Sequence, residues 1–258
     1  MRYIIELSYD GSAFCGWQVQ PSVPTVQGLI EESLGRLLRA ERVPVTGAGR
    51  TDTGVNAVGY RAHFDWEGPL PCTCAELTYK LSAILPDQIV VHSVREASGE
   101  DFHARFSATG RTYKYFIHFN KNPFVQRYSW YCHYPLDIDA MNEACACLLG
   151  THDFSCFEKK GGNNATSICT VTEARWEYYT PGCIDILGYP ADDKYLVFTI
   201  SADRFLRNMV RATVGSMVEV GRGRRAPGWI AELMESGTRS DAGESVIGEA
   251  LFLTEVRY

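Results

Sequence analysis

The sequence has no long hydrophobic run and no excess of basic residues. No stretch approaches the ~18 consecutive apolar residues that a membrane-spanning helix needs, and the first residues, MRYIIELSYDG, enter a strand-like pattern directly. We therefore expect no signal peptide, no membrane association and a cytoplasmic location. The 25 Lys and Arg are outnumbered by 31 Asp and Glu, which gives a net charge of −6. This balance excludes a protein that coats nucleic acid through net charge alone, although a local basic groove remains compatible with it.

Cysteine spacings typical of zinc fingers or redox motifs are also lacking. The 9 cysteines are an odd number, no C-x-x-C occurs, and the C-x-C pairs in CTC (72–74) and CAC (145–147) have no His at finger spacing. This usage indicates buried thiols in a reducing cytoplasm, rather than disulfides or a metal site.

Two phosphate-binding motifs begin in the segment GAGRTDTGVNA (47–57) and are not completed. Asp52 stands where the third glycine of G-x-G-x-x-G belongs, and Val55 replaces the lysine of a phosphate-binding loop. What is present is a glycine-bounded turn that carries Arg50 and Asp52. The turn is either a functional loop or a hairpin loop in which the two charges pair at the surface.

Hydrophobic periodicity predicts the order β-α-β-β-α-β in the first part of the chain. Thr25 is the expected cap of the first helix, and Pro86 ends the second. The predicted elements are a strand at 3–9, a helix at 25–40, strands at 42–48 and 57–66, a helix at 73–85 and a strand at 88–95.

The second part repeats this order, with insertions at 153–168 and 180–194. Asp203 is the expected cap of its long helix. The predicted elements are a strand at 111–119, a helix at 137–149, strands at 169–179 and 195–202, helices at 203–220 and 227–236, and a strand at 250–257. The duplication predicts an α+β protein of two ferredoxin-like (RRM-like) halves, 1–100 and 101–258, with a ligand cleft between them.

Arginines and tyrosines of the second half are candidates for contacts with nucleic acid. Arg204, Arg207 and Arg211 are spaced by three and then four residues, so a helix would align them as a phosphate-binding ridge or a solvated face. Tyr113 and Tyr115 alternate in a predicted strand and therefore share one side of it. Such a pair belongs to the core, or stacks on nucleobases at ~1–3 kcal/mol per base.

Asp52 is the candidate for chemistry. A carboxylate in such a loop can act as a nucleophile, a general base, a metal ligand or a cap. The other nearby acid, Asp65, falls in a strand pattern, which argues against paired-carboxylate hydrolysis and a magnesium cage. These features together favour nucleic acid as the partner without specifying a reaction.

Seven segments, in order along the chain, resemble the tRNA pseudouridine synthase A family. They are YDGSAFCGWQVQP (9–21), TVQGLIEESL (25–34), AGRTDTGVNA (48–57), DFHARFSATGRTYKYFI (101–117), LLGTHDFSCF (148–157), RFLRNMVRATVGSMVEVG (204–221) and ALFL (250–253). The resemblance implies an isomerase that flips uridines 38, 39 and 40 out of the tRNA anticodon stem-loop and converts them to pseudouridine. It further implies a homodimer without a cofactor or a required metal, and two halves joined through one continuous, mostly antiparallel sheet.

The same resemblance implies roles for individual residues. Asp52 matches the catalytic aspartate, Arg211 the basic residue that pairs with it, and Tyr113 the tyrosine that stacks on the uracil and later helps to remove a proton. Arg50 matches an arginine that contacts the flipped nucleotide, and Leu251 an apolar residue near the base.

Three further positions complete the expected substrate contacts. Asn56 stands where the family usually has His, a departure that weakens one contact and leaves the assignment of Asp52 intact. Arg204 and Arg207 are the expected contacts to phosphate.

Three rival interpretations stay open at this level. A non-catalytic RNA-binding module would use the same Arg and Tyr residues without needing Asp52. A metal-assisted nuclease or phosphatase would need a cluster of acids. A purely structural loop predicts that the substitution Asp52→Asn changes mainly stability.

Overall fold

The computed structural model describes residues 1–98, 102–161, 165–188 and 195–258. The chain divides into two compact units, one of Met1–Thr109 with Leu253–Tyr258 and one of Gly110–Phe252. The boundary expected between residues 100 and 101 lies outside the described residues, as do parts of the two expected insertions. Both units combine helices with mostly antiparallel strands, so the predicted α+β class is confirmed.

The first unit has the strand order β4-β1-β3-β10, in which β1 pairs antiparallel with β3 and β4, and β2 pairs antiparallel with β3. Strand β10 begins in the second unit and ends in the first. Alternate side chains of β1, among them Ile5 and Leu7, are buried as the period of a strand requires. The strands are β1 (Arg2–Tyr9), β2 (Val45–Gly47), β3 (Asn56–Asp65), β4 (Ile89–Glu96) and β10 (Leu251–Arg257).

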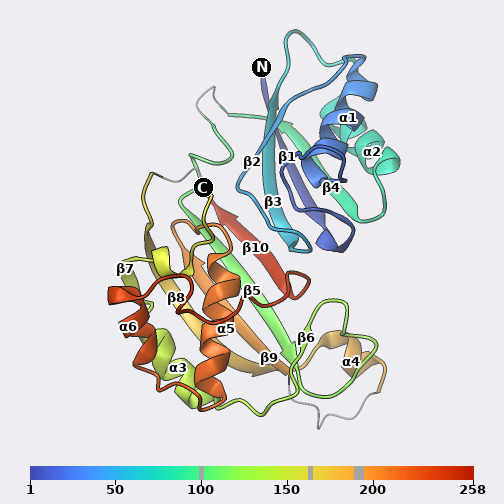
Figure 1. The fold of residues 1–258 in the computed structure, drawn as a ribbon. Coiled ribbons are helices and arrows are strands. Elements are labelled where there is room, and N and C mark those ends of the chain that lie inside the picture. The colour runs from blue at the N-terminus through green and yellow to red at the C-terminus, as the bar shows by residue number, and fades with distance from the viewer. Residues whose placement is uncertain (99–101, 162–164, 189–194) are drawn as a thin grey trace. The chain divides into compact units, whose positions relative to one another are not determined.

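Two helices, α1 (Val26–Leu38) and α2 (Cys74–Ile84), pack side by side in the first unit (Figure 1). Thr25 caps α1 as predicted, because its side chain accepts a hydrogen bond from Gly28 N–H. Thr73 and Glu76 form a capping box at the start of α2. A short 3₁₀ turn, η1 (Gly11–Ala13), follows β1 and leads towards α1.

The second unit has the antiparallel strand order β5-β9-β8-β7, and the short β6 pairs with β5 in parallel. All eight residues of β9 are buried, as expected for a strand with neighbours on both sides. Sequence periodicity missed β6 and β7, which are too short to show a period. The strands are β5 (Gly110–His118), β6 (Trp130–Tyr131), β7 (Gly150–Asp153), β8 (Ile168–Tyr179) and β9 (Tyr195–Ala202).

Helices α3, α5 and α6 of the second unit pack on one another and on its strands (Figure 1). The middle of α5 lies so close to the segment between α6 and β10 that a Cβ on Gly215 would lie 1.8 Å from the carbonyl oxygen of Glu244. The helical elements are α3 (Ile138–Ala146), α4 (Gly182–Ile186), α5 (Met209–Gly221), α6 (Trp229–Ser236) and the 3₁₀ turn η2 (Ser155–Phe157).

The expected start of the long helix at Asp203 is wrong, because α5 begins at Met209. The Asp203 carboxylate accepts hydrogen bonds from the N–H groups of Thr170, at 2.8 Å, and Arg204, at 2.7 Å, so this residue is tied to β8. Asn208 then adopts a left-handed conformation with φ of 64°, which a helix interior does not allow.

Candidate active site

Asp52 lies in the loop of residues 48–55 that joins β2 to β3 in the first unit, and we call this segment the Asp52 loop. The Asp52 side chain is half-buried, whereas Arg50 is exposed. The loop makes its own turn, because Val55 N–H donates to the backbone oxygen of Asp52 at 3.1 Å. Gly54 has φ of 78°, so the turn needs a residue that tolerates the left-handed region.

The Asp52 loop is hydrogen-bonded to β3 at its N-terminal end. Ala48 N–H donates to the backbone oxygen of Arg61 at 2.8 Å, which extends the pairing of β2 with β3. Tyr60 donates its hydroxyl to the backbone oxygen of Gly49. A segment held in this way is an ordered scaffold for a side chain.

An aromatic cluster of Tyr9, Trp17 and Tyr60 packs within the first unit close to this loop. Trp17 and Tyr60 have ring centroids 4.2 Å apart, and Tyr9 and Tyr60 5.5 Å apart. All three side chains are buried. Gly47 is required beside them, since a Cβ there would lie 2.1 Å from the Tyr60 hydroxyl. The cluster supplies a rigid apolar support that composition and spacing do not reveal.

Asn56 lies at the end of the Asp52 loop and is 2% exposed. Its Oδ1 atom accepts a buried hydrogen bond of 2.8 Å from Gly11 N–H. Gly11 in turn contacts the loop so closely that a Cβ would meet the backbone oxygen of Val55 at 2.1 Å. In this structure the Asn56 amide therefore joins the loop to η1.

The second unit holds Tyr113, which lies on β5 opposite Ile200 of β9. Its ring is half-buried and meets the ring of Phe205 edge-to-face, with centroids 5.0 Å apart. Tyr115, two residues further on, is fully buried, and burial raises the pKa of its hydroxyl well above the usual value. The predicted tyrosine pair is thus divided into a core residue, Tyr115, and a more accessible ring, Tyr113.

Arg211 is in the first turn of α5 and is half-buried. Its Nε donates to the backbone oxygen of Val246 at 2.7 Å, and Val246 N–H donates to the backbone oxygen of Arg211 at 3.3 Å. This reciprocal contact fixes the guanidinium at the N-terminal end of the helix. Val246 was not predicted as a partner, since 35 residues separate the two positions.

Arg204 and Arg207 precede α5 and do not form the helical ridge with Arg211 that their spacing predicted. Arg207 is exposed, and its Nη1 donates to the backbone oxygen of Lys160 at 3.4 Å. Arg204 is half-buried. Leu251, the expected apolar neighbour of the base, is the first residue of β10 and is 4% exposed.

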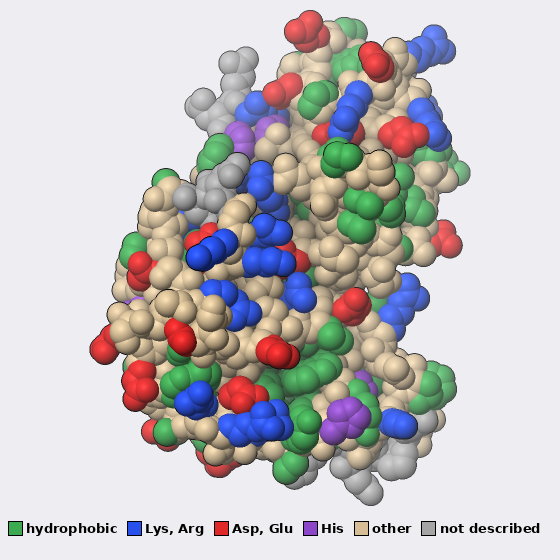
Figure 2. Space-filling model, in the orientation of Figure 1, with side chains coloured by type: hydrophobic (Ala, Val, Ile, Leu, Met, Phe, Trp, Pro, Cys, Tyr) green, Lys and Arg blue, Asp and Glu red, His purple; other side chains and the backbone are tan. Residues whose placement is uncertain are grey.

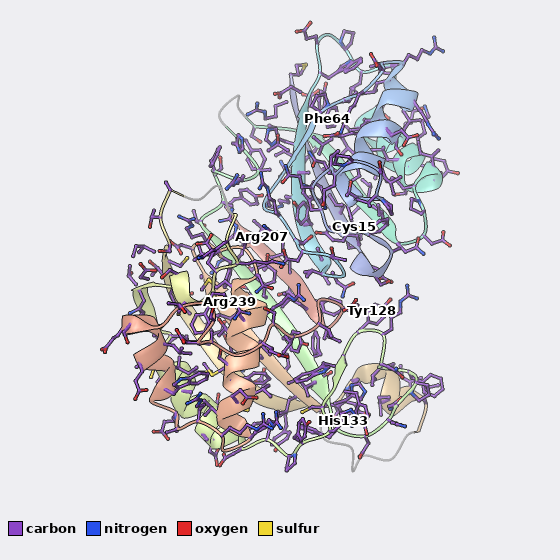
Figure 3. The ribbon with its side chains drawn as sticks, viewed as in Figure 1. Cys15, Phe64, Tyr128, His133, Arg207 and Arg239 are labelled. Atoms are coloured by element: carbon purple, nitrogen blue, oxygen red, sulfur yellow. The ribbon has the colours of Figure 1, made fainter. Side chains whose placement is uncertain are left out.

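A local basic patch nevertheless forms at the start of α5. Figure 3 places Arg207 and Arg239 close to this end of the helix, and Figure 2 shows Lys and Arg side chains gathered on the same face of the second unit. Arg239 and Asn208 both hydrogen-bond to the hydroxyl of Ser245, at 2.7 and 2.6 Å. The acidic chain therefore carries a cationic surface, to which Arg239 contributes without having been predicted.

The nine cysteines are all free thiols, of which Cys132, Cys145, Cys156 and Cys169 are buried. Burial raises the pKa of Cys145 to about 12. Within the described ranges no group of three His, Cys, Asp or Glu side chains is arranged to hold a metal ion. A search of the same residues finds no helix suited to crossing a membrane.

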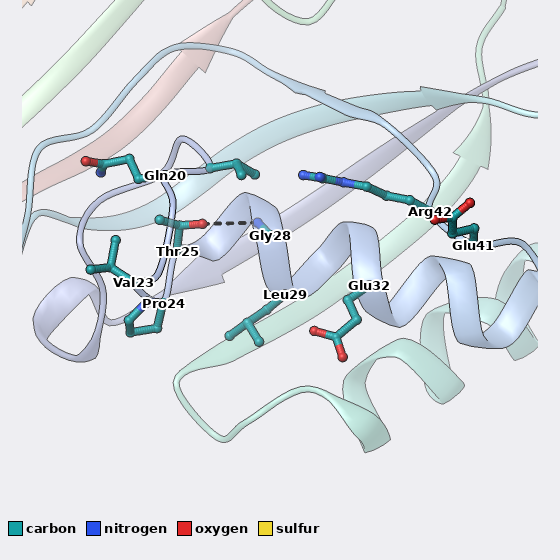
Figure 4. Close-up of a pocket in the computed structure, with 10 residues that line it drawn as sticks. Gln20, Val23, Pro24, Thr25, Gly28, Leu29, Glu32, Glu41 and Arg42 are labelled. Atoms are coloured by element: carbon teal, nitrogen blue, oxygen red, sulfur yellow. Dashed lines mark hydrogen bonds between the residues drawn. The ribbon is translucent and has the colours of Figure 1, made fainter.

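A pocket of about 400 Å³ lies in the first unit beside the start of α1 (Figure 4). Its walls carry the carboxylates of Glu32 and Glu41 and the guanidinium of Arg42, whose Nε donates to Glu31 at 2.6 Å. None of the residues expected at the active site lines this pocket.

Comparison with known proteins gives matches over the full chain. A family described as tRNA pseudouridine synthase matches residues 144–258. The tRNA pseudouridine synthase A of Parabacteroides distasonis is 44% identical over 257 residues, covering 100% of this chain and 96% of the relative. The same-named protein of Bacteroides fragilis is 43% identical over 258 residues, with 100% and 96% covered. That of Chlorobaculum tepidum is 41% identical over 255 residues, with 98% and 96% covered.

Proposed function

The chain belongs to the tRNA pseudouridine synthase A family, and we propose that it isomerises uridine to pseudouridine at positions 38, 39 and 40 of the tRNA anticodon stem-loop. The observation that carries this proposal is identity of 43–44% that extends over the whole chain, so that both units with their candidate residues are included. The proposed enzyme is cytoplasmic, as its tRNA substrate is, and it acts as a homodimer without a cofactor.

The reaction is an isomerisation within one nucleotide. The N1–C1′ bond of uridine breaks, the uracil turns, and a C5–C1′ bond forms. The proton on C5 leaves, and N1 gains one, so no redox partner is consumed. The protein has to supply one group that attacks or takes a proton, and a site that retains the detached base.

Asp52 is the proposed catalytic group. Its carboxylate either adds covalently to the substrate or removes a proton from the ribose on a route through a glycal, and both routes need a single acid. Arg211 is the proposed partner of this carboxylate. The hydrogen bond from Arg211 Nε to Val246 supports this role, because it holds the guanidinium in a fixed place at the start of α5.

The target base must leave the anticodon stem before it can react, which costs a few kcal/mol. Tyr113 is proposed to stack on the flipped uracil and later to help remove a proton, with Leu251 packing near the base. Arg50 is proposed to contact the flipped nucleotide, and its exposure at the surface of an ordered loop supports that role. Stacking of ~1–3 kcal/mol per base is comparable to the cost of flipping.

Arg204 and Arg207 are proposed to bind tRNA phosphates, which the basic patch at the start of α5 supports (Figure 2). Asn56 is proposed to contribute to substrate binding through the loop that it joins to η1. The proposed architecture is the pair of ferredoxin-like halves that share one mostly antiparallel sheet.

The second candidate is a non-catalytic RNA-binding module, which the same basic patch and Tyr113 also fit. The two candidate functions differ in whether pseudouridine is formed. A tRNA transcript with uridine at positions 38, 39 and 40 is incubated with the protein, and pseudouridines are located by carbodiimide modification and primer extension. We expect stops at these positions and none on a matched transcript with cytidine there. Binding of the uridine transcript without any stop would favour the binding module.

A further inference from the structure

Thr51, the residue before Asp52, is hydrogen-bonded through both its side chain and its backbone. We propose that Tyr9 is a positioning residue that holds the Asp52 carboxylate in its productive place through Thr51. This inference rests on the proposed function, in which Asp52 is the catalytic group. It concerns residues of the first unit alone.

Thr51 is held by its side chain and by its backbone. Its hydroxyl shares a buried hydrogen bond of 2.9 Å with the hydroxyl of Tyr9. Its backbone oxygen accepts a hydrogen bond of 3.2 Å from Trp17 N–H. Thr51 is 7% exposed, whereas Asp52 beside it is only half-buried. The two contacts fix the peptide from which the Asp52 side chain extends.

The chain at Gly16 packs closely against this peptide. Gly16 lies against it, and a Cβ there would stand 2.4 Å from the backbone oxygen of Thr51 and 3.2 Å from the carbonyl carbon of Asp52. Gly16 also has φ of 86°. A side chain at position 16 would therefore displace the loop as well as strain its own backbone.

Tyr9, the partner in this hydrogen bond, is held by strand pairing and by ring packing. Its backbone pairs with both neighbouring strands, opposite Ala57 of β3 and Ile89 of β4. Its ring contacts Trp17 and Tyr60, with centroids 6.1 and 5.5 Å away, and the residue is 4% exposed. The position of the Tyr9 hydroxyl is thus set by the pairing of β1 with β3 and β4 and by the aromatic cluster, and Thr51 transmits that position to Asp52.

The bland alternative is that the two hydroxyls satisfy each other's hydrogen-bonding groups in a buried place. That role predicts lower thermal stability in variants but an unchanged rate for the molecules that remain folded. A positioning role predicts a slower chemical step with tRNA binding retained, since misplacement of a catalytic group by about 1 Å can cost roughly 100-fold in rate.

The test uses single-turnover kinetics, with the full-length protein in saturating excess over tRNA that carries tritium at uridine C5. The variants are Tyr9→Phe, Thr51→Val and both together, with Thr51→Ser as the conservative variant. Tyr3→Phe is the control. Tyr3 is also buried on β1, and within the residues that the structure describes its hydroxyl hydrogen-bonds only to the Met1 sulfur, at 3.8 Å. Filter binding gives the Kd for tRNA.

We expect each single variant to lower the single-turnover rate about tenfold or more with the Kd unchanged. The double variant is expected to be no slower than the slower single variant, because the two single substitutions remove the same hydrogen bond. Thr51→Ser and Tyr3→Phe are expected to keep the wild-type rate. Wild-type rates for Tyr9→Phe and Thr51→Val would overturn the inference, and so would losses that multiply in the double variant.

Asp52→Asn in the same assay separates this inference from the proposed function. Tritium release by the wild type but not by Asp52→Asn, together with wild-type rates for Tyr9→Phe and Thr51→Val, would overturn the positioning role alone. Absence of release by the wild type, or full release by Asp52→Asn, would overturn the proposed function and the inference with it.

Discussion

The ring of Tyr113 on β5 meets the ring of Phe205 edge-to-face, with the two centroids 5.0 Å apart and an angle of 84° between the planes. Phe205 belongs to the irregular segment between β9 and α5. Sequence periodicity had predicted that Phe205 lies in a helix, and this prediction was wrong. The orientation of Tyr113, the proposed stacking partner of uracil, therefore depends on a residue outside the helices.

Phe205→Ala should therefore reduce activity without abolishing it. An aromatic pair contributes ~0.5–1.5 kcal/mol beyond buried area, and a loss of this size in transition-state binding lowers kcat/KM by up to about tenfold. The measurement is tritium release under multiple-turnover conditions. Phe124→Ala, at an exposed position of the same unit, is the control. Equal kcat/KM for Phe205→Ala and the wild type would contradict a supporting role for Phe205.

Arg204→Gln and Arg207→Gln should weaken tRNA binding mainly through electrostatics. Each phosphate contact that is lost should reduce the slope of log K against log salt concentration by about 1. Filter binding at several salt concentrations measures this slope. Arg36→Gln is the control, because Arg36 pairs with Glu32 on the surface of α1. Unchanged slopes in Arg204→Gln and Arg207→Gln would place the phosphate contacts elsewhere.

Stability should fall in acid because of His63. This side chain is 4% exposed, and burial lowers its pKa to about 4, with Arg2 and His103 acting in the same direction and Asp65 opposing them. Its Nδ1 accepts a hydrogen bond of 3.1 Å from Ala104 N–H, which requires an unprotonated nitrogen.

In the unfolded chain histidine has a pKa near 6.5. Between pH 6.5 and about 4, His63 is therefore protonated in the unfolded chain and unprotonated in the folded chain. The His63 contribution to stability is therefore complete above pH 6.5 and decreases as the pH falls through this window. Urea unfolding at a series of pH values tests this. His63→Gln should show a shallower decrease than the wild type, and parallel curves would show that His63 does not titrate on unfolding.

Thr73→Ala should destabilise the first unit by about 1 kcal/mol, the usual effect of removing an N-cap side chain. The Thr73 hydroxyl accepts from Glu76 N–H at 3.2 Å, and the Glu76 carboxylate accepts from Thr73 N–H at 2.8 Å. Thr73→Ser preserves both contacts and should retain the wild-type midpoint in chemical unfolding. A Thr73→Ala midpoint equal to that of the wild type would mean that the box does not stabilise α2.

Local patterns in the sequence predicted most elements of the fold. The apolar stripe of α1 and its Thr25 cap, and the alternation in β1 and β5, are properties of consecutive residues, and the structure confirms them. The start of α5 could not be predicted in this way. It depends on the hydrogen bond between the Asp203 carboxylate and Thr170, which is 33 residues away in the chain.

The residues of the candidate site were also predictable only where the signal lies in consecutive residues. Local sequence features singled out Asp52, Tyr113 and Arg211 as candidates, and motifs that resemble a family implied their roles. The residues that hold them in place were not found, because their contacts join distant parts of the chain. Tyr9 and Thr51 are 42 residues apart, and no periodicity or spacing relates a strand-end tyrosine to a loop threonine.

The proposed enzyme forms pseudouridine with Asp52 as the catalytic group. The most direct measurement is tritium release from tRNA labelled at uridine C5, made with the wild type and with Asp52→Asn, beside a binding measurement for both. We predict release by the wild type alone, with tRNA affinity retained in the variant. Release by both proteins would contradict the role of Asp52, and binding without release by either would contradict the synthase.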